Sequence, residues 1–184
     1  MTEPSLPDKV VAIHAELRGA RVGHAFGGAL ALAYYAEPRA TIDIDLNVFV
    51  APERHAAVHA ALRPLGVGDE VDAAALARDG QCRWWWGRTP VDLFFAYDEL
   101  HDAMRRAVRT VPFGEGTTIP ILSPEHLAVC KAVFDRPKDW LDIEQVLVCE
   151  ADLDVAEVER WLSRIAGPSD RRTVRFGELA AATR

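Results

Sequence analysis

Two patterns of hydrophobic and polar residues occur along the chain, and together they predict a mixture of helices and strands. Residues 8–18 carry apolar side chains at helical spacing, with Asp8 as the expected N-cap and Gly19 as the helix stop. Residues 41–50, TIDIDLNVFV, instead alternate with a period of two, which predicts a β-strand. Strands and helices are therefore expected to intermix in the first two thirds of the chain.

The same signals predict the remaining elements. We expect strands at 22–26, 82–87, 90–97 and 118–122, with 82–87 and 90–97 joined as a hairpin through Arg88-Thr89, and helices at 29–36, 52–62, 72–79 and 98–109. Ser123 is the expected N-cap of a further helix and Pro124 its first residue, and the chain is predicted to be helical from there on. The predicted organisation is a core at 1–122 followed by a helical C-terminal part at 123–184 that packs on it.

Composition excludes several classes of protein. Of the 184 residues, 49% are hydrophobic and 27% are charged, which is unlike disordered or low-complexity chains. No apolar run approaches the ~18 residues that a membrane span needs, and the first ten residues lack the order of a secretory signal. The three cysteines include no CxxC pair, which argues against a disulfide framework or a zinc ribbon. We expect a cytoplasmic protein without a membrane partner.

The charge of the chain bears on its partners. The net charge is −7, whereas a protein that binds mainly nucleic-acid phosphates is usually basic. Residues 160–184 depart from this average, because they contain six arginines and only two acidic residues. Two interpretations stay open at this point: a local basic patch on an acidic body, or an ordinary solvated helix face.

Asp43 and Asp45 are the first candidate for chemistry. Two residues apart on the predicted strand, both side chains should point to the same face, where two carboxylates repel each other. A divalent cation resolves this repulsion, because Mg²⁺ takes oxygen ligands from one or two carboxylates and from substrate phosphates. The alternative is an edge strand whose polar face is merely solvated.

A third carboxylate, Asp92, strengthens the metal interpretation. It is the one acidic residue in the apolar run from Val91 to Phe95. If this strand pairs beside 41–50, Asp92 completes a triad of carboxylates suited to two metal ions. The alternative is that Asp92 is neutralised by Arg88 or by a backbone donor.

Gly27-Gly28 lies where a strand is expected to turn into a helix. Glycine there permits a close approach of the backbone to a ligand, and the free N–H groups of a helix start favour an anion. By itself a pair of glycines is most often an ordinary tight turn. Its position shortly before the Asp43-x-Asp45 strand favours a role in phosphate binding, because a nucleoside triphosphate site needs both a phosphate-binding turn and a metal-binding strand.

Taken together, HAFGGALALAYYAEPRATIDIDL resembles the nucleotidyltransferase superfamily with the DNA polymerase β-like core. That signature consists of a Gly-Gly or Gly-Ser turn, a helix, a strand with Asp-x-Asp and a later third carboxylate, here Gly27, Gly28, Asp43, Asp45 and Asp92. The run from Arg39 through Thr41 to Leu46 is similar to the AbiEii/MenT-like branch, which contains many toxins of toxin–antitoxin systems. The resemblance implies an α+β fold, a mixed sheet flanked by helices.

The second half of the chain supports the same branch. SPEHLAVCKAVFDRPKDWLDI is similar to its C-terminal motif, a helix with a lysine followed by Arg-x-Lys-Asp-x-x-Asp, and the matching residues are Lys131, Arg136, Lys138, Asp139 and Asp142. A lysine ammonium is a compact charge suited to a phosphate, so Lys131 is predicted to contact the triphosphate. Asp139 and Asp142 are predicted to anchor Lys131 or Arg136, the alternative being a surface salt-bridge network.

The resemblance implies a transfer of a nucleoside monophosphate from a nucleoside triphosphate to an acceptor hydroxyl. The expected metal ligands are Asp43, Asp45 and Asp92, which would hold two Mg²⁺ ions. These three residues and Lys131 form the expected catalytic set. The expected nucleotide-binding residues are Gly27, Gly28, Arg39, Thr41, Lys131 and Lys138, with Arg136, Asp139 and Asp142 supporting them.

The resemblance favours an RNA acceptor, specifically a tRNA end, and a toxin paired with an antitoxin protein. The basic segment at 160–184, with Arg105, Arg106 and Arg109, is the expected RNA-contacting rim. Two alternatives remain: a small-molecule acceptor of the aminoglycoside type, whose amines suit an acidic body, and a degenerate module that binds nucleotide without catalysis.

Overall fold

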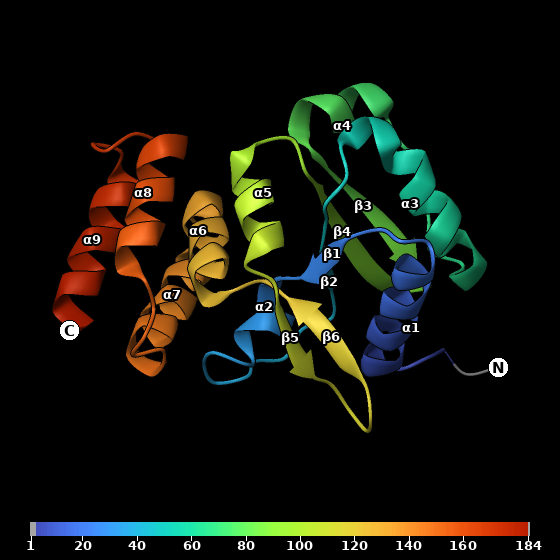
Figure 1. Ribbon diagram of the computed structural model, residues 1–184, viewed down its shortest axis with the longest axis horizontal. Helices are drawn as coiled ribbons and strands as arrows, with labels where there is room; N and C mark the ends of the chain where they lie inside the picture. Colours follow the sequence, from blue (N-terminus) through green and yellow to red (C-terminus); the bar gives the residue numbers. More distant parts are fainter. Residues whose placement is uncertain (1–2, 184) are drawn as a thin grey trace. The chain divides into compact units, whose positions relative to one another are not determined.

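Six strands form one sheet in the described part of the computed structural model, residues 3–183 (Figure 1). Their order across the sheet is β3-β4-β2-β1-β6-β5. The strands are β1 (His24–Phe26), β2 (Ile44–Val48), β3 (Gln81–Trp86), β4 (Thr89–Phe95), β5 (Arg109–Pro112) and β6 (Thr118–Ile121). The pairs β1–β6 and β2–β4 are parallel and the other pairs are antiparallel, so the sheet is mixed as the sequence predicts.

Helices make up most of the remaining chain. They are α1 (Leu6–Gly19), α2 (Gly28–Leu32), α3 (His55–Leu62), α4 (Ala73–Asp79), α5 (Glu99–Arg106), α6 (Pro124–Phe134), α7 (Pro137–Cys149), α8 (Val155–Ile165) and α9 (Arg171–Thr183). Within residues 3–183, no helix combines the length and the apolar composition that crossing a membrane requires. The predicted α+β class, a mixed sheet with flanking helices, is confirmed.

The chain divides into two compact units. The first contains the described residues up to Gly27 together with Ala40–Ile121, and therefore the whole sheet. The second contains Gly28–Arg39 and the described residues from Leu122 on. Helix α2 and the loop that follows it thus group with the C-terminal helices, although the sequence-based boundary at 122 places them in the core.

One face of the sheet in the first unit is apolar, and this fixes the direction of the acidic residues. The strands β2 and β4 run side by side in register, and their alternate residues are at most 1% exposed: Ile44, Leu46 and Val48 on β2, and Val91, Leu93 and Phe95 on β4. Because successive side chains on a strand point to opposite faces, the residues between these positions lie on the other face. Asp45 and Asp92 are among them.

The predicted strand at 41–50 is shorter in the structure, where β2 begins only at Ile44. Thr41 and Asp43 bond to each other instead of to a neighbouring strand: the Thr41 hydroxyl donates to the Asp43 carboxylate, and the Asp43 amide lies 3.4 Å from the same hydroxyl. Such local bonds compete with the sheet ladder. The prediction that Ile42 continues the apolar face is wrong, since its side chain is 78% exposed.

The hairpin of β3 and β4 is confirmed, with a turn one residue earlier than the sequence suggested. Trp86 pairs with Thr89, so the two turn residues are Gly87 and Arg88. Gly87 has φ of 59°, in the left-handed region that two-residue hairpin turns require and glycine adopts most easily. This turn sets which residue of β3 lies beside Asp92.

Two other predicted boundaries are wrong. The helix expected at 98–109 ends at Arg106, and Arg109–Pro112 forms the strand β5, which pairs with β6. The helix expected at 29–36 ends at Leu32 in a series of turns. Pairing with β6 decides the structure of the first of these two segments.

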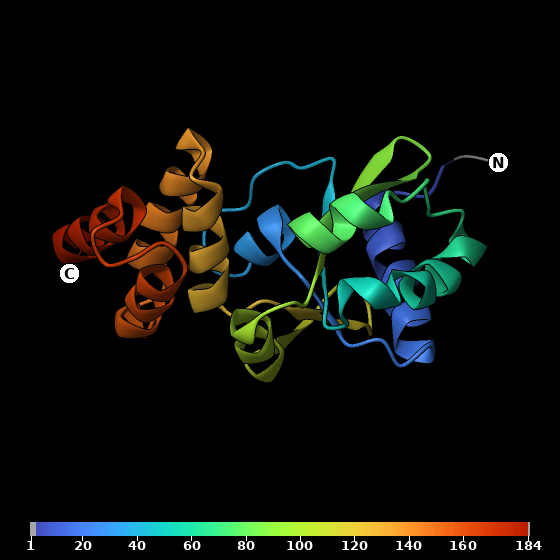
Figure 2. The same cartoon turned by 90° about the horizontal axis from the view of Figure 1, so that it is seen from above.

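The second unit is a group of helices, α6 to α9, with α2 packed on α6 (Figure 2). Helix α6 begins as predicted, because the Ser123 side chain accepts a hydrogen bond from the His126 amide and Pro124 is the first helical residue. The buried core of this unit includes five large apolar residues that are at most 1% exposed: Leu127, Ile143, Val158, Leu162 and Phe176.

A buried histidine in the first unit predicts a loss of stability in acid. His24 on β1 is 7% exposed, and its two ring nitrogens lie 2.9 Å from His14 Nδ1 and from the Val22 carbonyl oxygen. Burial lowers the pKa of His24 to about 4. As the pH falls below about 6.5, the unfolded state takes up this proton first, so stability is complete above pH 6.5 and is lost towards pH 4.

We therefore expect the free energy of unfolding, measured by urea titration, to fall by about 3 kcal/mol through this one group between pH 7 and pH 4. His24→Gln removes the titrating ring, so its stability should depend less steeply on pH over the same range. Equal pH slopes for the wild type and the variant would contradict the assignment.

Candidate active site

Asp45 and Asp92 are direct neighbours on the face of the sheet opposite its apolar core. Asp45 lies on β2 and Asp92 on β4, and the two are register partners in the parallel pair of strands. Register partners on adjacent strands have backbones about 4.8 Å apart and side chains on the same face. Two carboxylates at this spacing repel each other unless a positive charge lies with them.

Arg83 supplies a positive charge in the same row. It lies on β3 and is the register partner of Asp92 from the other side. Its Nε and Nη2 atoms donate to the two carboxylate oxygens of Asp92 at 2.6 and 2.8 Å. The hydrogen bond to Asp92 is the main reason why the pKa of Arg83 is raised, and the negative charges of Asp43 and Asp45 raise it further.

This contact corrects one expectation. The alternative considered for Asp92 was neutralisation by Arg88, but Arg88 pairs with Glu3 instead, at 3.5 Å. The partner of Asp92 is Arg83, a residue that the sequence reasoning did not name. Its signal was the hairpin register: a turn at Gly87-Arg88 places Arg83 opposite Asp92, whereas a turn one residue later does not.

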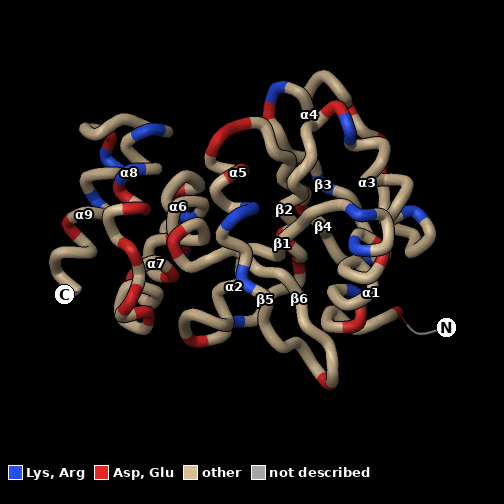
Figure 3. The backbone as a smooth tube through the Cα atoms, viewed as in Figure 1, with Lys and Arg blue, Asp and Glu red and all other residues tan. Residues whose placement is uncertain are grey.

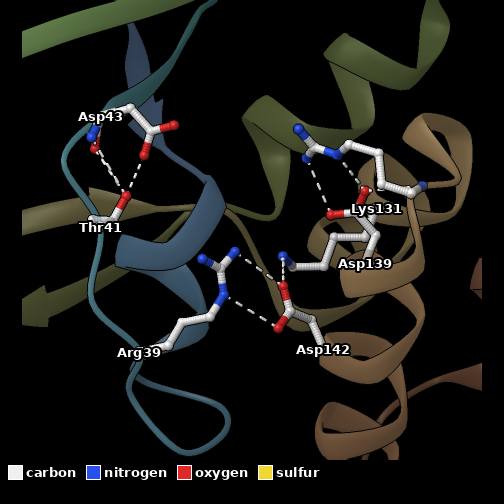
Figure 4. Close-up of polar contacts among 7 residues, drawn as sticks. Arg39, Thr41, Asp43, Lys131, Asp139 and Asp142 are labelled. Carbon is white, nitrogen blue, oxygen red and sulfur yellow. Dashed lines mark hydrogen bonds and ion pairs between the residues drawn. The ribbon is translucent and has the colours of Figure 1, made fainter.

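Asp43 reaches this region from the segment that leads into β2. It lies outside the strand, half-buried, and its carboxylate accepts the hydrogen bond from the Thr41 hydroxyl (Figure 4). The predicted alternation of Asp43 and Asp45 on one regular strand is therefore wrong. Asp43 nevertheless lies close enough to Arg83 for its charge to act on the guanidinium.

The donor set of this face suits a hard divalent cation, which takes carboxylate oxygens as ligands. Across residues 3–183, no three His, Cys, Asp or Glu side chains already lie close enough together to hold a metal ion. The arrangement of Asp92 agrees with this, because both of its oxygens accept from Arg83. Asp43, Asp45 and Asp92 thus fit Mg²⁺ in chemistry, with a guanidinium beside them.

The glycine turn lies directly after β1. The Gly27 amide donates to the carbonyl oxygen of Asp45 at 2.9 Å, which fixes the turn to the strand that carries this carboxylate. Gly28 has φ of 53° and begins α2, so a side chain at this position would strain the backbone. Of the two amides expected to face a phosphate, that of Gly27 is occupied by Asp45.

A buried ionic cluster lies in the second unit (Figure 4). Lys131 on α6 is 4% exposed, and its Nζ donates to Asp142 Oδ2 at 2.6 Å. Arg39, in the loop after α2, donates to the two oxygens of the same carboxylate at 3.2 and 3.3 Å. Asp142 on α7 therefore holds both cations in place. The predicted anchoring of Lys131 is present. The Lys131–Asp142 pair is buried while Arg39 is exposed, and the burial of the pair argues against an ordinary surface network.

The neighbouring residues of the C-terminal motif form a second pair. Asp139 is fully buried and accepts from Arg136 Nε at 2.6 Å and from Nη2 at 3.1 Å (Figure 4). It also accepts from the Arg136 amide at the start of α7, so this pair secures the helix start. Lys138 lies on the same helix and is exposed.

A comparison with protein families identifies the family of the chain. The model of the family "Nucleotidyl transferase AbiEii toxin, Type IV TA system" matches residues 17–179, which include both the carboxylate face and the ionic cluster. The chain belongs to the AbiEii nucleotidyltransferase toxin family. It is accordingly an enzyme of the nucleotidyltransferase class, and the resemblance predicted from the two motifs is confirmed.

Solved structures share the fold of this AbiEii-family enzyme. The antibiotic-resistance factor ANT(2'')-Ia in solution is 18% identical over 98% of both chains, with a TM-score of 0.61. Its crystal structure with adenylyl-2''-tobramycin gives 16% identity, 96% and 95% coverage and a TM-score of 0.53. The lincosamide antibiotic adenylyltransferase LnuA is 13% identical over 79% of this chain and 98% of its own, with a TM-score of 0.55.

These identities show a shared fold and no more. No curated protein matches the AbiEii-family chain in sequence. The expected polymerase β-like nucleotidyltransferase fold is confirmed. Because the family establishes an enzyme class, the alternative of a module without catalytic activity is set aside.

Proposed function

We propose that this enzyme transfers a nucleoside monophosphate from a nucleoside triphosphate to an acceptor hydroxyl at the Asp43, Asp45 and Asp92 face of the sheet. The acceptor oxygen attacks the α-phosphorus, a new P–O bond forms, and the bond to the leaving pyrophosphate breaks. The observation that carries this proposal is the register pairing of Asp45 with Asp92, two carboxylates side by side away from the apolar core.

Divalent cations fit the proposal, with Asp43, Asp45 and Asp92 as the residues that would hold them. When bound, such cations lower the pKa of an attacking hydroxyl and offset the charge on a leaving oxygen. Asp92 is the proposed acceptor of the hydroxyl proton, which requires that Arg83 release one of the two carboxylate oxygens that it contacts. Asp45 has its backbone fixed by the Gly27 amide, so its carboxylate starts from a defined position.

The nucleotide-binding roles of Gly27, Gly28, Arg39, Thr41, Lys131 and Lys138 remain proposals. For Lys131, the bond to Asp142 uses one of the three donors of the ammonium group, which leaves donors for a phosphate oxygen. Arg136, Asp139 and Asp142 keep their supporting roles through the contacts described above.

An RNA acceptor, specifically a tRNA end, is the first candidate. The family description as a toxin of a toxin–antitoxin system supports it, and with it a cognate antitoxin protein as partner. The expected RNA-contacting residues are the arginines of segment 160–184 with Arg105, Arg106 and Arg109. A cytoplasmic location remains a prediction.

The arrangement of the arginines favours a second candidate, a small cationic acceptor. Arg171 pairs with Asp135, Arg172 donates to Asp170 at 2.8 Å, and the Arg175 guanidinium lies 4.3 Å from the centre of the Trp140 ring. Figure 3 shows both acidic and basic segments on α8 and α9. A net charge of −7 suits a cationic acceptor. ANT(2'')-Ia, whose crystal form holds adenylyl-2''-tobramycin, supports this candidate by its fold.

An assay with both acceptor classes distinguishes the candidates. Purified enzyme is incubated with Mg²⁺, each of the four α-labelled nucleoside triphosphates, and either total RNA or an aminoglycoside panel. With RNA as acceptor, transfer should fall steeply from low to physiological salt, and Arg171→Ala/Arg172→Ala/Arg175→Ala should lower it about tenfold or more, because each lost phosphate contact weakens binding.

With a small cationic acceptor, the same triple variant should transfer label as fast as the wild type. Transfer to RNA that is unchanged in the triple variant would remove the basis for the arginine rim. Growth arrest on expression, abolished by Asp43→Ala, would support the toxin assignment over an antibiotic-modifying enzyme.

A further inference from the structure

Arg83 lies beside Asp92, at one end of the row of charged residues in the proposed site. Its guanidinium donates to both oxygens of Asp92, at 2.6 and 2.8 Å, in the two-pronged geometry that gives the strongest arginine–carboxylate pairs. In the sheet the row runs from Arg83 on β3 through Asp92 on β4 to Asp45 on β2. A positive group of this chain thus occupies the position beside Asp92 where the reaction calls for a cation.

The environment of Arg83 differs from that of an ordinary surface pair. Its side chain is 54% exposed, whereas that of Asp92 is 18% exposed, so a solvent-accessible guanidinium covers a more enclosed carboxylate. The partner of the guanidinium is Asp92, and the charges of Asp43 and Asp45 also act on it to a smaller extent. Arg78 and Asp79 on α4 form a pair of the same two-pronged geometry, at 2.8 and 2.7 Å, outside this cluster.

We propose that Arg83 is a built-in counter-ion that competes with a divalent cation for Asp92 and thereby sets the cation affinity of the site. This inference rests on the proposed function, because it concerns the same carboxylates. While Asp92 accepts both hydrogen bonds from Arg83, an incoming cation meets a like charge and an occupied ligand. Binding requires the guanidinium to turn towards solvent, and its exposure leaves this path open.

Mn²⁺ binding to the intact protein, measured by the electron paramagnetic resonance signal of the free ion, tests the inference without reference to activity. Arg83→Gln removes the competing charge, so the Mn²⁺ dissociation constant should fall about three- to tenfold. This fold-change corresponds to the free energy of a partly exposed arginine–carboxylate pair. Arg83→Lys keeps the charge but loses the two-pronged geometry, and should bind Mn²⁺ with an affinity between those of the wild type and Arg83→Gln.

Arg78→Gln is the matched control, since it removes an equivalent pair away from the carboxylate face, and it should bind Mn²⁺ as the wild type does. Far-UV circular dichroism and thermal melting establish that each variant is folded. If the wild type binds Mn²⁺ and a folded Arg83→Gln variant binds it no more tightly, this inference alone is overturned. No Mn²⁺ binding by either the wild type or Arg83→Gln overturns the proposed function as well, because the carboxylates then hold no cation even without the guanidinium.

Discussion

Asp142→Asn is expected to destabilise the second unit by about 3 kcal/mol. Asp142 balances the charge of Lys131, whose side chain is 5% exposed, and it also accepts from Arg39. The substitution preserves the shape of the side chain but removes its charge, so the Lys131 ammonium is left buried without a counter-ion. An uncompensated buried charge is far more costly than the loss of an exposed pair.

Urea unfolding followed by circular dichroism measures this effect. Glu144→Gln is the matched control, because Glu144 is an exposed acidic residue on the same helix, and it should change stability by less than about 0.5 kcal/mol. A second variant, Lys131→Met/Asp142→Leu, removes both charges and should be less destabilised than the sum of its two single substitutions. Equal effects of Asp142→Asn and Glu144→Gln would contradict the buried cluster.

The parts of the fold that follow from local chemistry could be predicted from the sequence. Ser123-Pro124 begins α6 as expected, since a hydroxyl cap and a proline at the first position act within one turn. The alternation of Leu46 and Val48 with polar residues predicts β2 correctly, because one face of the sheet is buried. The strand β5 could not be predicted in this way, as its pairing with β6 depends on a neighbouring strand.

The candidate site shows the same limit more sharply. The sequence supplied Asp45 and Asp92 as candidates, and the register of β2 and β4 brings them side by side. Asp43 was expected on the strand, but its bond with Thr41 holds it in the preceding segment. Arg83 was missed, because a one-residue error in the hairpin turn changes which side chain faces Asp92.

The largest effect on activity is expected from Asp45→Asn. Asp45 lies beside Asp92 on the polar face, and its amide replacement keeps the size of the side chain while removing the negative charge that a cation needs. We expect nucleotidyl transfer to fall at least about a hundredfold, the usual cost of losing one group that stabilises developing charge. Stability should change little or rise, because the repulsion between two adjacent carboxylates is relieved.

Asp69→Asn is the control for Asp45→Asn, since Asp69 is an acidic residue outside the sheet, before α4. The most direct test of the proposed site is the rate of label transfer from an α-labelled nucleoside triphosphate, measured in parallel for the wild type, Asp45→Asn and Asp69→Asn with Mg²⁺ and the pooled acceptors. The wild type and Asp69→Asn are expected to transfer label at equal rates, and folded Asp45→Asn to transfer almost none. Equal transfer by the wild type and Asp45→Asn would contradict the assignment of this carboxylate face as the active site.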